Sequence, residues 1–69
     1  MKLSARNILK GTVVKVVPGS VNSEVTIRVA DGIEIVSMVS KNSVDQLGLK
    51  PGVAAYAIIK ASNVILGVD

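Results

Sequence analysis

The choice of bulky side chains is the feature that most restricts how this 69-residue chain can fold. It has thirteen Val and seven Ile but no Phe and no Trp, although 49% of its residues are hydrophobic. β-Branched side chains have few rotamers and pack well on a pleated surface, so they favour strands over helices. The sequence therefore predicts a single all-β domain over residues 1–69.

Two missing residue types limit how such a small domain can be stabilised. A chain of this length buries a small share of its surface and commonly depends on a disulfide, a metal or a partner subunit. The absence of Cys excludes a disulfide, and without Cys and His a metal cation lacks its common protein ligands. We therefore expect self-association to supply the missing burial.

The N-terminal half of the sequence predicts three strands. Gly11 precedes the apolar run "TVVKVV", and "SEVTIRVADGIEIVSMV" alternates around an Asp31-Gly32 turn that is typical of a β-hairpin. Direct opposition across this turn predicts a register with these pairs: Ala30 with Ile33, Arg28 with Ile35, Ile27 with Val36, and Val25 with Met38. The core face would then consist of Val25, Ile27, Val36 and Met38.

The C-terminal half predicts one short helix and two further strands. Ser40 is a suitable N-cap and Gly48 a suitable C-terminal cap, which predicts about two helical turns between them. The segments "VAAYAIIK" and "SNVILGVD" follow, and Val64, Leu66 and Val68 alternate in the second. Five strands with a helix after the third are typical of an OB-like barrel.

Several of these strands carry apolar residues on both faces, and a small barrel hides only one face of each strand. A homo-oligomer would cover the second face, whereas the alternative is that the surface merely carries scattered apolar residues.

The longest apolar run, "VAAYAII", is too short for a membrane span of about 20 residues. The apolar runs between Lys2, Arg6 and Lys10 are too short to form a signal peptide. We therefore expect a cytoplasmic protein without a membrane partner.

The polar residues argue against catalysis and nucleic-acid binding. Without His or Cys the commonest general base and nucleophile are missing, and the five carboxylates are scattered along the chain. Tyr56 is the only aromatic residue, whereas single-stranded nucleic acid usually stacks on several. The net charge of +3 suits an anionic ligand, although it also fits ordinary solubility.

Three short motifs could together hold an oxyanion. "SARN" supplies Ser4 and Arg6, "SKNS" supplies two hydroxyls at a predicted helix start, and "KAS" supplies Lys60 and Ser62. Hydroxyls, cations and helix amides all donate hydrogen bonds, as an oxyanion requires. Each motif also has a simpler explanation, since Ser40 could only cap the helix, Lys60 could be solvated and Arg6 could form a salt bridge.

The ordered set of "SARN", "GTV", "VNSEV", "SKNSVDQLGLKPG" and "IIKASNVIL" resembles the molbindin or Mop domain family. The resemblance runs from Lys2 to about Val68, and Ser40 stands where the family commonly has Thr. It implies an OB-like barrel that assembles as a hexamer, a trimer of dimers, with molybdate or tungstate bound at subunit interfaces for intracellular storage. An alternative is binding of the molybdopterin cofactor itself, which would need a flat apolar wall that only Tyr56 could offer.

The same resemblance implies the residues of the sites. The interface pocket would use Ser4, the Ala5 amide, Arg6, Ser40, Ser43, Lys60 and Ser62. A second oxyanion site would involve Gly19, Ser20, Val21 and Asn22. The charges of Arg6 and Lys60 would balance the two negative charges of molybdate, because a buried dianion without such compensation is costly to desolvate.

Overall fold

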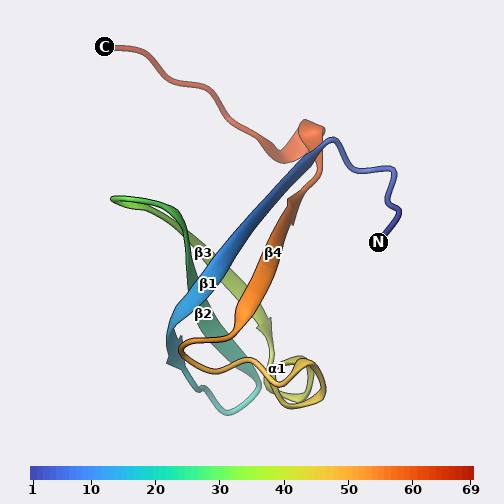
Figure 1. Ribbon diagram of the computed structural model, residues 1–69, viewed down its shortest axis with the longest axis vertical. Coiled ribbons are helices and arrows are strands. Elements are labelled where there is room, and N and C mark those ends of the chain that lie inside the picture. Colours follow the sequence, from blue (N-terminus) through green and yellow to red (C-terminus); the bar gives the residue numbers. More distant parts are fainter.

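The computed structural model describes residues 1–69 as one curled antiparallel sheet with a short helix (Figure 1). The strands follow the order β3-β2-β1-β4 across the sheet. The elements are β1 (Asn7–Val17), β2 (Asn22–Ala30), β3 (Ile33–Ser40), α1 (Lys41–Leu47), β4 (Ala54–Ile59) and the 3-10 helix η1 (Ala61–Asn63). The predicted β-rich class is confirmed.

Strand β1 is longer than the predicted run after Gly11, because its two halves pair with different neighbours. Residues Asn7 to Thr12 pair with β4, and Thr12 to Val17 pair with β2. Gly11 therefore lies inside the strand, where a Cβ atom would sit 2.5 Å from the carbonyl oxygen of Arg28. A glycine at this position lets β1 approach β2 closely.

The predicted Asp31-Gly32 turn is confirmed, but most of the predicted register is wrong. Ala30 pairs with Ile33 as expected, and an extra residue in β2 then shifts every later pair by one. Arg28 consequently pairs with Glu34, where the guanidinium and carboxylate form a 2.9 Å ion pair.

The shifted register also changes which residues form the core face. Ile27 lies opposite Ile35, and Val25 lies opposite Ser37. Val36 and Met38, which the sequence placed in the core, are 60% and 64% exposed. Because side chains alternate between faces, a shift of one residue moves a whole strand's set to the other face.

Helix α1 has the predicted caps. The Ser40 side chain accepts a hydrogen bond from the Ser43 amide, and Gly48 adopts a left-handed conformation with φ of 65°. The amides of Gly48 and Leu49 donate to the carbonyls of Asp45 and Val44 and close the helix end.

The predicted fifth strand is not formed within the chain. Residues 61–63 form the 3-10 helix η1, and residues 64–69 have no regular secondary structure and extend away from the sheet (Figure 1). A strand exists only where another strand accepts its hydrogen bonds, and this segment has no neighbour. The sheet therefore stays open between its edge strands β3 and β4.

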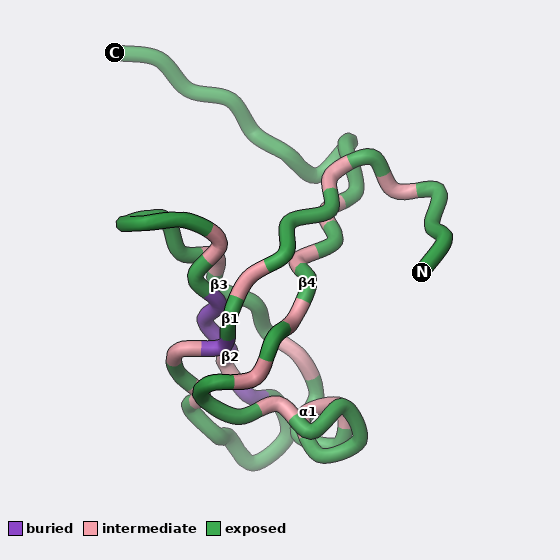
Figure 2. Tube along the Cα trace, viewed as in Figure 1, coloured by how far each residue is buried: buried purple, intermediate pink, exposed green.

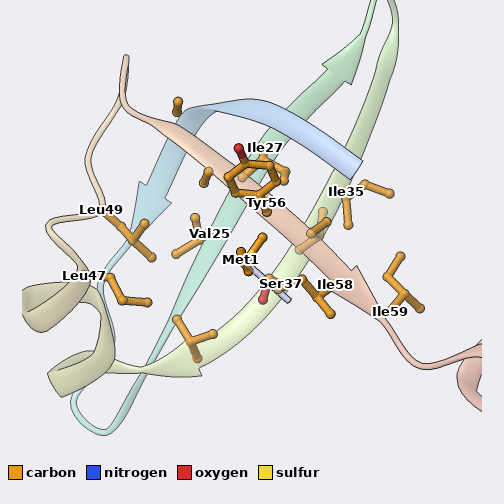
Figure 3. A pocket seen from close by; sticks show the side chains of 15 residues that line it. Met1, Val25, Ile27, Ile35, Ser37, Leu47, Leu49, Tyr56, Ile58 and Ile59 are labelled. Atoms are coloured by element: carbon orange, nitrogen blue, oxygen red, sulfur yellow. The ribbon is translucent and has the colours of Figure 1, made fainter. Parts of the chain in front are cut away.

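The hydrophobic core is small and lies where β1 crosses β2 (Figure 2). Only Val13, Val25 and Ile27 are fully buried hydrophobic residues. An apolar groove of about 560 Å³ opens beside them, and Ser37 is the one polar residue among the 15 that line it (Figure 3). None of the helices has the length and apolar character needed to cross a membrane.

Candidate functional site

The pairing of β1 with β4 brings two of the three predicted motifs to one end of the sheet. Asn7 at the start of β1 pairs with Ile59 at the end of β4, and its side-chain amide donates to the Ile59 carbonyl at 3.3 Å. The segments that flank this pair are Ser4 to Arg6 and Lys60 to Ser62, and Figure 1 shows them meeting beside η1. We call this group the cationic end.

The charges at the cationic end have no carboxylate partners in the chain. Arg6 and Lys60 are exposed, and the only ion pair in the structure joins Arg28 to Glu34. The simpler explanation of Arg6 as half of a salt bridge therefore does not hold within one chain. Two neighbouring cations without carboxylates produce a positive potential that favours an anion.

Ser40 and Ser43 lie at the other end of the sheet, next to α1. The Ser40 hydroxyl accepts from the Ser43 amide at 3.0 Å and donates to the Ser43 hydroxyl oxygen at 2.7 Å. Ser40 is thus committed to capping, whereas the Ser43 hydroxyl proton has no acceptor in the chain. Ser43 can therefore donate to a ligand without breaking the cap.

The turn predicted to form a second site lies beside Ser40. Asn22 pairs with Ser40, and the Lys41 amide donates to the Val21 carbonyl at 2.9 Å. The turn residues themselves are exposed, with Val21 at 73%. We call Ser40, Ser43 and this turn together the hydroxyl end.

One chain does not bring the seven predicted pocket residues together. The cationic end and the hydroxyl end lie at opposite ends of β1, and a strand of 11 residues spans about 30 Å. An oxyanion a few ångströms across contacts only one of these ends in a given chain. A pocket that uses both sets of residues has to combine the ends of different copies.

The sequence prediction did not include the apolar groove between β3 and β4. Tyr56, Ile58 and Ile59 line it from β4, and Ile35 lines it from β3 (Figure 3). In the sequence, residues 53–59 carry apolar side chains on both faces of the predicted strand. This pattern indicated self-association, but it did not indicate where in the fold a groove would form. No group of three or more His, Cys, Asp or Glu residues gathers anywhere in the chain.

The cap of α1 gives a stability prediction. We expect Ser40→Ala to lower the free energy of unfolding by about 1 kcal/mol, because the Ser43 amide loses its acceptor. Thermal unfolding followed by circular dichroism at a fixed protein concentration measures the change. Ser20→Ala, in an exposed turn without a side-chain hydrogen bond, is the control, and equal melting temperatures for the two variants would contradict the capping role.

Comparisons with known proteins place this arrangement in a family. The TOBE domain model matches residues 3–66. A probable molybdenum-pterin-binding protein from Haemophilus influenzae is 51% identical over the full length of both chains. The chain is a TOBE domain of the molybdenum-pterin-binding protein family. The resemblance to the Mop family drawn from the short motifs is thereby confirmed.

Solved structures resemble the TOBE domain along its whole length. MopII from Clostridium pasteurianum superimposes with a TM-score of 0.91 and is 40% identical, with 97% of this chain and 100% of that chain covered. The cytoplasmic molybdate-binding protein ModG, in a form with molybdate bound, superimposes with a TM-score of 0.95 and is 61% identical. The TOBE domain is covered completely by that match and spans 49% of the ModG chain.

Proposed function

We propose that this TOBE domain binds molybdate, without converting it, in pockets formed between copies of the chain. The observation that carries this proposal is the 61% identity over the whole chain to ModG, whose structure holds molybdate. The cationic end adds physical support, because Arg6 and Lys60 offer two positive charges to a dianion and have no carboxylate partner in the chain.

The proposed pocket joins the cationic end of one copy to the hydroxyl end of another. Ser4, the Ala5 amide, Arg6, Lys60 and Ser62 would come from the first end. From the second end Ser43 would donate to the oxyanion, and Ser40 would hold Ser43 in place through its two hydrogen bonds. The uncommitted proton of the Ser43 hydroxyl fits a donor role. The turn residues Gly19, Ser20, Val21 and Asn22 would supply backbone amides to a second type of pocket nearby.

The proposed assembly is a hexamer, a trimer of dimers, that stores molybdate in the cytoplasm. Three buried hydrophobic residues are a small core for 69 residues, which supports further burial between copies. ModG, the relative with molybdate bound, is described as cytoplasmic. Tungstate has the same charge and shape as molybdate and should occupy the same pocket. In this proposal the protein binds the oxyanion and has no catalytic activity.

Isothermal titration tests the proposal. We expect saturable heat when molybdate is added to the purified protein, and a much weaker response to sulfate, which shares the charge and tetrahedral shape. Elemental analysis of the natively purified assembly should find molybdenum or tungsten in fixed proportion to the chain. Molybdate heat no greater than the sulfate heat would contradict the proposal.

Binding of a pterin is a second candidate, which the name of the Haemophilus influenzae relative favours. Tyr56 is 50% exposed and lines the apolar groove, so it offers one flat aromatic wall. Absorbance of the purified protein separates the candidates, because a stoichiometric pterin band supports the cofactor and its absence supports the free oxyanion.

A further inference from the structure

Asn7 joins the two strands at the cationic end. It forms the outermost pair of β1 with β4, and residues 1–6 before it have no regular secondary structure. Its side-chain amide donates to the Ile59 carbonyl oxygen at 3.3 Å. This is the only side-chain hydrogen bond of the chain that joins segments distant in sequence. Because the end of a ladder opens most easily, the bond lies where the two strands most need a link.

The register places two cations opposite each other just beyond this pair. Asn7 pairs with Ile59 as the last step of a regular ladder, so one further step outward sets Arg6 against Lys60. Both cations are exposed, and neither has a carboxylate partner in the chain. Like charges directly opposite each other on neighbouring strands repel, which favours separation of the strand ends. The Asn7 hydrogen bond opposes that separation.

The backbone of Lys60 is held from both sides. A peptide unit is planar, so a hydrogen bond to the Ile59 carbonyl also orients the nitrogen and Cα atoms of Lys60. On the other side, the Lys60 carbonyl accepts from the Asn63 amide at 2.9 Å. Arg6 is covalently joined to Asn7 itself. Asn7 therefore connects the backbones of the two cations.

Asn7 makes this connection from the other face of the sheet. Side chains alternate along a strand, so Asn7 and Arg6 point to opposite faces. Asn7 is half-buried and shares its face with its partner Ile59, which lines the apolar groove. The hydrogen bond can therefore hold the two strand ends together without occupying the space that an anion between the cations would need.

We propose that Asn7 is a positioning residue for the oxyanion pocket, because its hydrogen bond to the Ile59 carbonyl holds Arg6 and Lys60 close enough together to contact one dianion. This inference rests on the proposed function, and it adds a residue that does not itself touch the ligand. Without the bond the two cations move apart in the empty pocket. Binding then has to bring them together again, and the affinity falls by the cost of that step.

Isothermal titration with molybdate tests this role with two matched variants. We expect Asn7→Ala to weaken binding by about 3- to 10-fold, which is within the range that one neutral hydrogen bond supplies. Asn63→Ala removes the same amide group from the same end of the sheet, but the Asn63 side chain makes no hydrogen bond. Its affinity should stay within about twofold of that of the unmodified chain, since no bond of this kind is lost.

Double-mutant cycles distinguish positioning from a general loss of stability. If Asn7 acts by placing Lys60, then Asn7→Ala should have little effect on the affinity of a Lys60→Ala background. In a Ser43→Ala background Asn7→Ala should keep its full effect, because Ser43 lies in α1 at the opposite end of the sheet (Figure 1). A substitution that only loosened the fold would weaken binding equally in both backgrounds.

The outcomes decide the role of Asn7 separately from the proposed function. Saturable molybdate binding that is equally strong in Asn7→Ala and the unmodified chain would overturn the positioning role and leave the proposed function intact. Equal losses from Asn7→Ala in the Lys60→Ala and Ser43→Ala backgrounds would also overturn it. An unmodified chain that gives no saturable heat with molybdate would remove the proposed function, and the positioning role with it.

Asn7→Asp covers the case in which Asn7→Ala does not fold. The aspartate side chain has the shape of asparagine but no N–H group when ionised, so it cannot donate to the Ile59 carbonyl. Asn63→Asp adds the same charge at the same end of the sheet and leaves the bond of Asn7 in place. We expect Asn7→Asp to bind molybdate at least about threefold more weakly than Asn63→Asp. Equal affinities of these two variants would overturn the proposal.

Discussion

Arg6→Ala is expected to weaken molybdate binding by about 10- to 150-fold, as measured by isothermal titration. In the proposed pocket the Arg6 guanidinium donates charge-assisted hydrogen bonds to the oxyanion, and losing one such bond corresponds to about 1.5–3 kcal/mol. No carboxylate of the chain pairs with Arg6, so its removal leaves no unpaired partner. The loss of affinity would thus come from the ligand contact alone.

Arg28→Ala is the matched control for Arg6→Ala. It removes the same charge, but Arg28 lies in β2 and pairs with Glu34, away from both ends of the sheet that carry the predicted pocket residues. We expect its molybdate affinity to change less than threefold. Equal losses in the two variants would mean that net charge, and not a specific pocket, determines binding. Both variants should first show the native mass of the unmodified protein.

The local features of this fold could be predicted from the sequence. The Asp31-Gly32 turn and the two caps of α1 depend on residues within a few positions of each other. The glycine in the turn and the glycine at the end of the helix allow backbone conformations that other residues rarely adopt, and the serine hydroxyl accepts a hydrogen bond from a helix amide. These requirements are local, so distant contacts do not alter them. These predictions were confirmed.

The features that depend on distant pairing could not be predicted. The bulge in β2 shifted the hairpin register, although both strands had been recognised correctly. The extension of β1 to Asn7 depends on its pairing with β4, where the partner residue Ile59 lies 52 residues later in the chain. The apolar alternation of 64–69 indicates a strand, but a strand forms only where an edge receives it.

The candidate site also has a part that forms within one chain and a part that depends on more distant contacts. The motifs "SARN" and "KAS" are 53 residues apart or more, yet the pairing of β1 with β4 brings them to one end of the sheet. Ser40 and Ser43 lie at the opposite end, so their place in a common pocket depends on contacts between copies. A single sequence identifies donors of the right chemistry, whereas the proposed pocket would join them only in an assembly of several copies.

The close approach of β1 to β2 predicts a large loss of stability in Gly11→Ala. The added Cβ atom would lie 2.5 Å from the Arg28 carbonyl oxygen and 3.1 Å from a methyl group of Val29. The backbone of Gly11 does not have a positive φ, so the expected effect comes from the contact and not from backbone strain. Separating the strands should lower the free energy of unfolding by about 1–3 kcal/mol. In a domain of this size each kcal/mol corresponds to about 4–8 °C in melting temperature.

Gly67→Ala is the control for Gly11→Ala, because nothing lies within 4 Å of the Cβ atom that it would add. Thermal unfolding of both variants should be measured at one protein concentration, since the melting temperature of a self-associating protein depends on concentration. If the strands are in close contact at Gly11, the melting temperature of Gly11→Ala should be clearly lower than that of Gly67→Ala. Similar melting temperatures would show that β1 and β2 can separate at little cost. The sheet that positions the cationic and hydroxyl ends would then be less rigid than the close strand contact implies.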